Sequence, residues 1–341
     1  MEYNLIPSFV LEDIVRFRRR MASSGIPEKI TDRNLLIGTW NIRSFGSYYS
    51  GWLENTGSPK RNLRALAILA EAIRCMDIVA IQEVRRETSG IRFLRDEFLG
   101  DDWGLLMSDV SAGVCGNSER LAFLYDRRRV HPSGLAGEIV LPATRSGDPA
   151  VQFCRSPYIV GFKAGKEQLT LLTAHINYGQ VPEDRLSELI ALAEFTAIEI
   201  RDRSFSPDSE ERNLIVLGDM NIDHRGQNPL FDAFVSTGLV VPEQILNLKT
   251  TFGAQAKHYD QIGWFMDPNF TLRYNDNAGV VDFTGSVFKE LSTSQMSYRI
   301  SDHFLLWVEF MTDRSVETIG RALGLSDIQL AMPDPLEVVP D

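Results

Sequence analysis

The sequence has few cysteines and no excess of positive charge. Only three of its 341 residues are cysteine, and Cys75, Cys115 and Cys154 form neither a CxxC pair nor a cluster with histidines. An odd number at such spacing indicates neither a disulfide framework nor a zinc site, so we expect reduced thiols, as in a cytoplasmic protein. Lys and Arg number 35 against 46 Asp and Glu, a net charge of −11. This balance excludes a polycationic nucleic-acid coat, whose affinity would come from many phosphate contacts.

Long apolar runs are also missing. No window approaches the roughly 18 apolar residues of a transmembrane helix, and the start Met-Glu-Tyr-Asn-Leu lacks the basic and apolar regions of a signal peptide. We therefore expect no membrane insertion and a cytoplasmic location. The hydrophobic fraction of 44% is ordinary for a globular protein, and a chain of this length can bury most of its surface.

Short apolar runs alternate with amphipathic patterns between residues 34 and 312. One predicted helix begins at Ser58-Pro59, a signal for a cap and a first turn, and another covers Pro182–Ile200. Because several strands follow one another without a helix between them, the pattern favours mixed sheets covered by helices over an all-parallel fold. The predicted strands are Leu35–Trp40, Asp77–Ile81, Leu121–Tyr125, Tyr158–Phe162, Leu169–Ala174, Leu214–Leu217, Tyr259–Phe265 and Phe304–Phe310.

Two segments flank this central region. Residues 1–33 place apolar side chains at helical spacing from Phe9 to Met21 with four arginines between them, which predicts a docked helix or an arm that faces a partner or nucleic acid. Residues 313–341 combine a short helical pattern with an acidic, proline-containing end, for which we expect a docked helix and a frayed terminus. The chain is thus divided into 1–33, 34–312 and 313–341, and the two flanks are the candidates for contacts with a protein partner.

Polar side chains stand at the ends of the apolar strands. Turn chemistry explains any one of them, but the set as a whole joins oxygen ligands for Mg²⁺, two histidines for proton transfer and amides that orient a phosphate. In Gly218-Asp219-Met220-Asn221, residues i and i+2 project to one side, so that a carboxylate and an amide can address the same phosphate. The set consists of Asn41, Glu83, His175, Asp219, Asn221, Asp260, Asp302 and His303.

These residues belong to an ordered series of motifs. In order and spacing, the series resembles the endonuclease/exonuclease/phosphatase superfamily, and most of all its pancreatic-type deoxyribonuclease branch, over about Asn34 to Thr312. Glu119–Tyr125 is similar to the glutamate-bearing strand of that branch, and Phe153–Pro157 to its phosphate-binding Arg-x-Pro segment. The motifs are Thr39-Trp40-Asn41, Ile81-Gln82-Glu83, Ala174-His175, Gly218-Asp219-Met220-Asn221, Tyr259-Asp260-Gln261-Ile262 and Ser301-Asp302-His303.

The resemblance implies a fold and an activity. The expected fold is an α/β four-layer αββα sandwich, in which two mixed β-sheets pack face to face and helices flank them. The expected activity is Mg²⁺-dependent phosphodiester hydrolysis, with Mn²⁺ as a substitute. The branch implies an endonuclease that binds DNA and leaves 5′-phosphate and 3′-hydroxyl ends.

The resemblance also implies roles for the site residues. Asn41, Glu83 and Asp302 would hold the metal ion, with Asp219 as a further ligand. His175 would pair with Asp260 and His303 with Glu119, because a carboxylate fixes the tautomer and raises the basicity of a histidine. Asp219 and Asn221 would orient the scissile phosphate, and Arg155 would neutralise its developing charge.

Several features leave other functions open. His175 separates the chain from abasic-site endonucleases, and Ile222-Asp223 after Asn221 separates it from inositol-polyphosphate phosphatases. Sphingomyelinase-like members share the histidine pair, so a phosphomonoesterase or a lipid phosphodiesterase is an alternative, and a non-catalytic interaction module is a third. The aromatic loop Tyr48–Trp52 either contacts a ligand, by stacking on bases or touching a membrane, or packs on a neighbouring loop. The segment Ile176–Gly179 departs from the branch and changes the rim of the predicted cleft.

Overall fold

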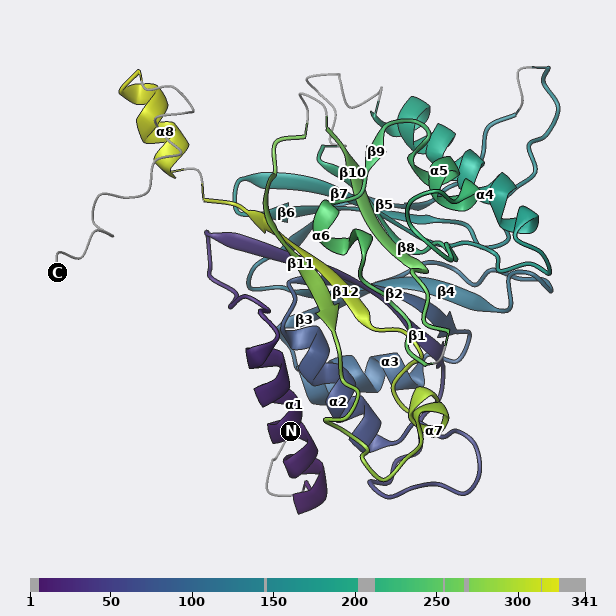
Figure 1. Ribbon diagram of the computed structural model, residues 1–341, viewed down its shortest axis with the longest axis vertical. Helices are drawn as coiled ribbons and strands as arrows, with labels where there is room; N and C mark the ends of the chain where they lie inside the picture. The colour runs from purple at the N-terminus through teal and green to yellow at the C-terminus, as the bar shows by residue number, and fades with distance from the viewer. Residues whose placement is uncertain are drawn as a thin grey trace.

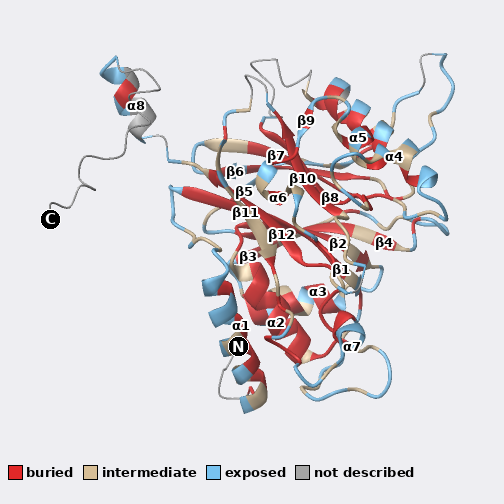
Figure 2. Ribbon diagram, in the orientation of Figure 1, coloured by how far each residue is buried: buried red, intermediate tan, exposed pale blue. Residues whose placement is uncertain are grey.

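Two six-stranded mixed sheets lie face to face, and helices cover their outer surfaces (Figure 1). The computed structural model describes residues 6–143, 146–201, 212–253, 255–266, 270–313 and 315–324. Buried residues concentrate in the strands and in the helix faces against them (Figure 2). The predicted four-layer αββα sandwich is confirmed.

The first sheet has the strand order β11-β12-β1-β2-β4-β3. Strands β1 and β2 run parallel, and the other neighbouring pairs run antiparallel. The strands are β1 (Asn34–Phe45), β2 (Ile78–Arg85), β3 (Trp103–Met107), β4 (Glu119–Asp126), β11 (Arg273–Val281) and β12 (Leu305–Met311).

The second sheet has the strand order β5-β6-β7-β8-β10-β9. It also contains one parallel pair, β7 with β8, among antiparallel neighbours. The strands are β5 (His131–Glu138), β6 (Tyr158–Ala164), β7 (Glu167–His175), β8 (Leu214–Asp219), β9 (Leu239–Val240) and β10 (Asp260–Phe265).

The helices form the outer layers. Helices α1 and α2 cover the first sheet, and α4, the π-helical η3 and α5 cover the second (Figure 1). Helix α2 begins later than predicted because the Asn62 side chain, not Ser58, caps it by accepting from the Ala65 N–H at 3.0 Å. The helices are α1 (Ser8–Ser23), α2 (Leu63–Arg74), α3 (Ser89–Phe93), η2 (Leu94–Leu99), α4 (Glu183–Phe195), η3 (Thr196–Arg201), α5 (Pro229–Val235), α6 (Glu243–Leu246), α7 (Thr293–Ser297) and α8 (Ser315–Ala322).

Strands of the central positions are apolar on both faces because both faces are covered. In β1, Leu35 and Ile37 belong to the core between the sheets, whereas Leu36 belongs to the core beneath the helices. Side chains of a strand alternate between faces, so a continuous apolar run is what such a position requires. The two cores thus hold the sheets in one relative position, on which the site depends.

The two flanking segments behave differently. Helix α1 buries Val10, Ile14, Phe17 and Met21 in the core that it shares with α2, as predicted, and Arg18 of its basic face binds Glu71. Helix α8 differs from the docked helix that we expected: of the apolar side chains described there, Ile319 is 59% exposed, and Leu323, directly after the helix, is 68% exposed. Residues 325–341 lie outside the described part of the chain. No helix among the described residues is long and apolar enough to span a membrane.

Candidate active site

Each sheet contributes its one parallel strand pair to the site. Asn41 and Glu83 stand toward the carboxyl ends of β1 and β2, and His175 and Asp219 end β7 and β8. The Asn41 Nδ2 donates to Glu83 Oε1 at 3.0 Å and, across to the second sheet, to Asp219 Oδ2 at 2.8 Å. The amide therefore joins the two strand pairs at one point.

Local backbone irregularities turn these side chains toward each other. Glu83 has a φ of 60° and Asn221 a φ of 51°, a left-handed conformation that is uncommon outside glycine. The register between β2 and β4 shifts between Ile81 and Val84, so a bulge re-aims Glu83. At Gly218, an added Cβ would lie 2.0 Å from the Ala174 carbonyl oxygen, which confirms that this glycine permits the close approach of β7 and β8.

Two histidine–carboxylate pairs form the centre of the site. His175 Nδ1 lies 2.9 Å from Glu119 Oε2, and His303 Nδ1 lies 2.7 Å from Asp260 Oδ2. All four side chains are buried. The predicted pairing, His175 with Asp260 and His303 with Glu119, is therefore wrong: the partners are exchanged.

Strand order explains the exchange. Asp260 on β10 is two strands from His175 on β7, and Glu119 on β4 is three strands from His303, which directly precedes β12. At about 4.8 Å per strand these separations are roughly 10 and 14 Å, too far for a hydrogen bond within one sheet. Because the two sheets face each other, each histidine instead meets a carboxylate from the opposite sheet.

Both imidazoles converge on Asp219. The Asp219 Oδ2 lies 3.6 Å from His175 Nε2 and 3.8 Å from His303 Nε2. Asp219, Asp260 and His303 each offer a ligand atom, and these atoms lie within 4.8 Å of one another. This is the one such group of three among the residues that the structure describes.

The buried charges polarise one another. Burial raises the pKa of Glu83, but His175, the Ser44 N–H and the Asn41 amide outweigh it and hold the pKa at about 2. Burial lowers the pKa of His303, but Asp260 and Asp219 outweigh it and raise the pKa to about 10. The pKa of His175 is raised in the same way, chiefly by its hydrogen bond to Glu119. The site is thus a dense array of anions and proton carriers.

The donor set fits a hard divalent cation. Asn41 Oδ1 and Asp260 Oδ1 are buried, and neither has a hydrogen-bond partner in the described structure. Carboxylate and amide oxygens are the ligands that Mg²⁺ takes in proteins. Asp302, which we expected among the metal ligands, has a 42% exposed side chain, and its Oδ2 lies 3.3 Å from Arg43 Nη1. It stands outside the group of Asp219, Asp260 and His303.

The residues expected to bind phosphate lie beside the His175 pair. Arg155 Nε is 2.7 Å from Glu119 Oε2, while its buried Nη1 has no hydrogen-bond partner within the described ranges. The Asn221 N–H donates to Asp219 Oδ1 at 2.9 Å, and its Nδ2 donates to the Ile176 carbonyl at 2.7 Å. The Asn221 amide nitrogen thus fixes the loop after His175.

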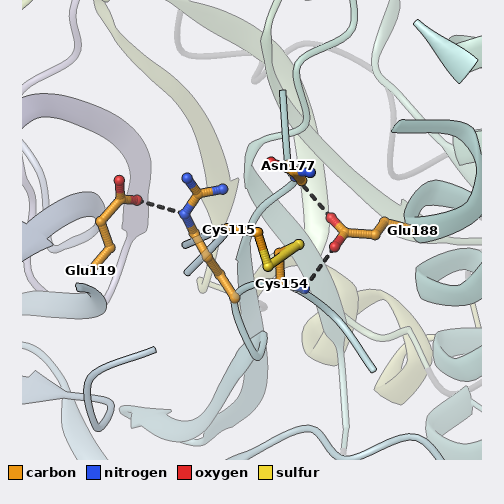
Figure 3. The surroundings of a disulfide bond; sticks show 6 residues. Cys115, Glu119, Cys154, Asn177 and Glu188 are labelled. Atoms are coloured by element: carbon orange, nitrogen blue, oxygen red, sulfur yellow. Dashed lines mark hydrogen bonds and ion pairs between the residues drawn. A yellow bond between two sulfur atoms is a disulfide. The ribbon is translucent and has the colours of Figure 1, made fainter. Parts of the chain in front are cut away.

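The expectation of three reduced cysteines is wrong. Cys115 and Cys154, 39 residues apart, form a disulfide with a Cα–Cα distance of 5.3 Å, and Cys75 is free (Figure 3). The bond joins the loop before β4 to the segment before β6, and so joins the two sheets beside Glu119 and Arg155. No spacing motif marks this pair, since the two cysteines meet only because the sheets face each other.

An aromatic rim borders the His303 side of the site. The Tyr259 ring lies 6.0 Å from the His303 ring and 6.2 Å from the ring of Tyr178, which is 53% exposed. The Arg185 guanidinium lies over Tyr178 at 4.0 Å and also donates to the Asn221 carbonyl. Tyr178 lies in the segment Ile176–Gly179 that departs from the branch, and no local pattern marks a role for it, because its proximity to Tyr259 depends on the fold.

The other aromatic loop packs against the protein. Tyr48 lies 4.5 Å from Phe93, and Trp52 lies 6.3 Å from Phe98, in each case between ring centroids. Of the two alternatives for this loop, packing is therefore the one that the structure supports for Tyr48 and Trp52.

Comparison with known proteins identifies the fold. No protein-family model and no curated protein match the sequence. The structure is similar to an endonuclease/exonuclease/phosphatase family protein from Bacteroides thetaiotaomicron (TM-score 0.53, 16% identity), with 82% of this chain and 96% of that one covered. The chain has the endonuclease/exonuclease/phosphatase fold.

Two further solved structures share this fold. One is D. rerio TDP2 complexed with a single-stranded DNA product, at a TM-score of 0.51 and 16% identity over 81% of this chain and 98% of that one. The other is a mannosyl-6-phosphatase from B. thetaiotaomicron, at a TM-score of 0.52 and 17% identity over 81% of this chain and 99% of that one. At this identity the likeness extends to the fold alone, and the pancreatic-type branch stays a prediction.

Proposed function

We propose that this protein is a metal-dependent phosphodiester hydrolase that acts as an endonuclease on DNA and leaves 5′-phosphate and 3′-hydroxyl ends. One observation carries the proposal: two buried imidazoles, each hydrogen-bonded to its own carboxylate, present their Nε2 atoms to the same oxygen of Asp219, at 3.6 and 3.8 Å. Hydrolysis of a diester needs one group to take a proton from water and a second to protonate the leaving alkoxide. The site offers both.

The chain's own residues supply the proton transfers. One of the two imidazoles, held by its carboxylate, accepts a proton as water attacks phosphorus, and the other donates a proton to the 3′ oxygen as the P–O3′ bond breaks. Glu119 and Asp260 fix the tautomers of His175 and His303. The free Nη1 of Arg155 is suited to a phosphate oxygen, whose charge grows in the transition state.

Mg²⁺, or Mn²⁺ in its stead, belongs to this proposal as the cofactor. Asn41, Glu83 and Asp219 are its proposed ligands, and Asp260 lies in the same group as Asp219. When bound, such an ion acts as a Lewis acid on the phosphoryl oxygens. The orphaned Asn41 Oδ1 is the observation that favours a cation here, since a buried oxygen without a donor is costly.

DNA as the substrate is supported by the aromatic rim and by a neighbour. Tyr178 is exposed and lies next to Tyr259, which contacts His303, and it offers a ring on which a base can stack. TDP2, which shares the fold, binds a single-stranded DNA product. The likeness to a mannosyl-6-phosphatase favours a phosphomonoesterase as the second candidate.

The test is a cleavage assay. Supercoiled plasmid, linear duplex, single-stranded DNA, RNA, mannose 6-phosphate and sphingomyelin vesicles are each incubated with Mg²⁺, Mn²⁺ or EDTA. We expect nicking of plasmid that EDTA abolishes and that His175→Ala reduces by orders of magnitude. His131→Ala, which changes an exposed histidine on the edge strand β5, is the matched control and should retain full activity.

The other outcomes assign the protein to another function. Phosphate release from mannose 6-phosphate without nicking would make the protein a monoesterase, and cleavage of sphingomyelin a lipid phosphodiesterase. Full activity of His175→Ala would overturn the mechanism. No turnover of any substrate and no metal-dependent rise in melting temperature would favour the non-catalytic module.

A further inference from the structure

The Cys115–Cys154 disulfide lies at the edge of the catalytic centre. Cys154 immediately precedes Arg155, and Cys115 lies four residues before Glu119, the carboxylate that holds both Arg155 and His175 (Figure 3). Glu119 belongs to β4 of the first sheet and His175 to β7 of the second. The disulfide therefore joins the sheets next to the histidine pair that also spans them.

The loop before Glu119 is a strained turn. Asn117 and Ser118 both have a φ of 55°, a left-handed backbone conformation that residues other than glycine adopt only when their surroundings enforce it. From this turn Asn117 Nδ2 donates to Glu119 Oε1 at 2.6 Å. The turn thus positions Oε1 of Glu119, the oxygen that does not face His175. Cys115 fixes this turn covalently to Cys154.

Each end of the disulfide is held to its own sheet by hydrogen bonds, and the disulfide is the covalent tie between them. The Cys154 N–H and the Asn177 N–H donate to the Glu188 carboxylate of α4 at 2.7 and 2.8 Å (Figure 3). The segment of Cys154 would therefore stay attached to α4 without the disulfide. On the other side, the Asn117 carbonyl accepts from Arg85 Nη1 at 2.7 Å and the Ser118 carbonyl from the Arg86 N–H at 3.0 Å, so the end of the turn stays near β2. Without the disulfide, the exposed segment around Cys115 loses its covalent tie to the second sheet, which leaves Asn117, the donor to Glu119, held from one side only.

We infer that this disulfide is a positioning element of the reaction, which holds Glu119 and Arg155 in place for His175, and that its reduction attenuates turnover. The inference rests on the proposed phosphodiesterase function. In the reaction a dithiol reductant transfers two electrons: the S–S bond breaks, Cys115 and Cys154 become thiols, and the reductant becomes a disulfide. Cys115 is exposed, so an attacking thiolate can reach it. The enzyme then works at its full rate in an oxidising environment and slowly in a reducing one.

The second histidine pair serves as an internal control. His303 is anchored without cysteines: its carbonyl accepts from Trp40 Nε1 at 2.8 Å, and its N–H donates to Ser301 Oγ at 3.0 Å. Reduction should therefore affect the Glu119–His175 pair and leave Asp260–His303 unchanged. A general loss of structure would disturb both pairs alike.

The experiment compares oxidised, dithiothreitol-reduced and reoxidised protein on plasmid and on bis(p-nitrophenyl) phosphate, well below the melting temperature of the reduced form. We expect reduction to lower kcat at least 10-fold and raise KM, with recovery after oxidised glutathione. Cys115→Ser/Cys154→Ser should match the reduced form, and Cys75→Ser should behave like the wild type. In Arg155→Ala/Glu119→Gln, reduction should cause less than a 2-fold further loss, because residues acting through one contact are not additive.

A readout independent of activity separates this inference from the proposed function. The Nδ1–H protons of His175 and His303 are followed by proton NMR and assigned with His175→Gln and His303→Gln. Reduction should shift or broaden the His175 signal and leave the His303 signal in place. Unchanged signals and unchanged kinetics would overturn the inference and leave the proposed function intact. If no phosphoester is cleaved and the His175 signal still shifts on reduction, the proposed function is overturned, whereas the positioning of Glu119 by the disulfide is supported.

Discussion

Asp260→Asn is the sharpest probe of the mechanism, because it replaces one carboxylate oxygen of a buried pair with an amide nitrogen and preserves the shape of the side chain. The carboxylate accepts from His303 Nδ1 at 2.7 Å. The pKa of His303 is about 10, which exceeds the ordinary histidine value by roughly 3.5 and corresponds to ~5 kcal/mol of imidazolium stabilisation. Asp260 and Asp219 share this effect, and Asp260 is the larger contributor. Removing one charge of a buried ion pair typically costs about 3 kcal/mol.

This free energy sets the expected loss of rate. About 3 kcal/mol corresponds to a decrease of roughly 10²-fold in kcat. If the asparagine amide also donates to Nδ1 and fixes the wrong tautomer, the decrease reaches about 10⁴-fold. The melting temperature should also fall, because the buried His303 imidazolium loses its counter-charge, so kcat is measured well below the melting temperature of the variant.

The assay is steady-state cleavage of bis(p-nitrophenyl) phosphate over a wide range of Mg²⁺ concentrations. Asp276→Asn, on the edge strand β11, is the matched control and should retain the wild-type kcat. A kcat of Asp260→Asn within 10-fold of wild type would refute the role of the pair. Full recovery at high Mg²⁺ would refute it differently, because it would make Asp260 a metal ligand and not the partner of His303.

Three further predictions concern metal, charge and packing. Glu83→Gln should abolish the rise in Tm with Mg²⁺, which for wild type at 100 times Kd is about 5 °C by calorimetry. Asp126→Asn removes a buried carboxylate bound to Lys29 and Arg128 and should lower the free energy of unfolding at pH 7 by about 2 kcal/mol in urea titrations. The pKa of Asp126 is held low, despite burial, by those two partners, so the stabilisation is present above about pH 4 and the difference from wild type closes as pH falls further. Phe17→Ala on α1, at a fully buried position, should cost about 3–5 kcal/mol in the same assay, while Val15→Ala, 45% exposed, should stay within about 0.5 kcal/mol.

The sequence predicted the central strands and missed the edges of the sheets. All eight predicted strands are present, and the four that were not predicted, β3, β5, β9 and β11, are the edge strands of the two sheets. A central strand is buried on both faces and has a continuous apolar run. An edge strand such as β5, whose residues are all exposed or half-buried, has no such run. Its pairing is decided by the neighbouring strand, which local sequence does not contain.

The site was predictable residue by residue but not pair by pair. Asn41, Glu83, His175, Asp219 and His303 do meet, because polar side chains at strand ends share an edge of the sandwich. Which histidine binds which carboxylate depends on strand order and on how two sheets face each other. The disulfide depends on the same packing. Because it is present, the expectation of reduced thiols no longer supports a cytoplasmic location, which stays a prediction.

Under the proposed function, the crossed pairing of histidines and carboxylates makes the apolar interior part of the catalytic apparatus. In each pair the base comes from one sheet and its orienting acid from the other, so the alignment of the reacting groups is set by side chains that never meet substrate. A displacement of about 1 Å can cost roughly 100-fold in rate. A slide of one sheet over the other would misalign both pairs together. Turnover should therefore fail on heating before the chain unfolds, and selection on the reaction is also selection on the packing between the sheets.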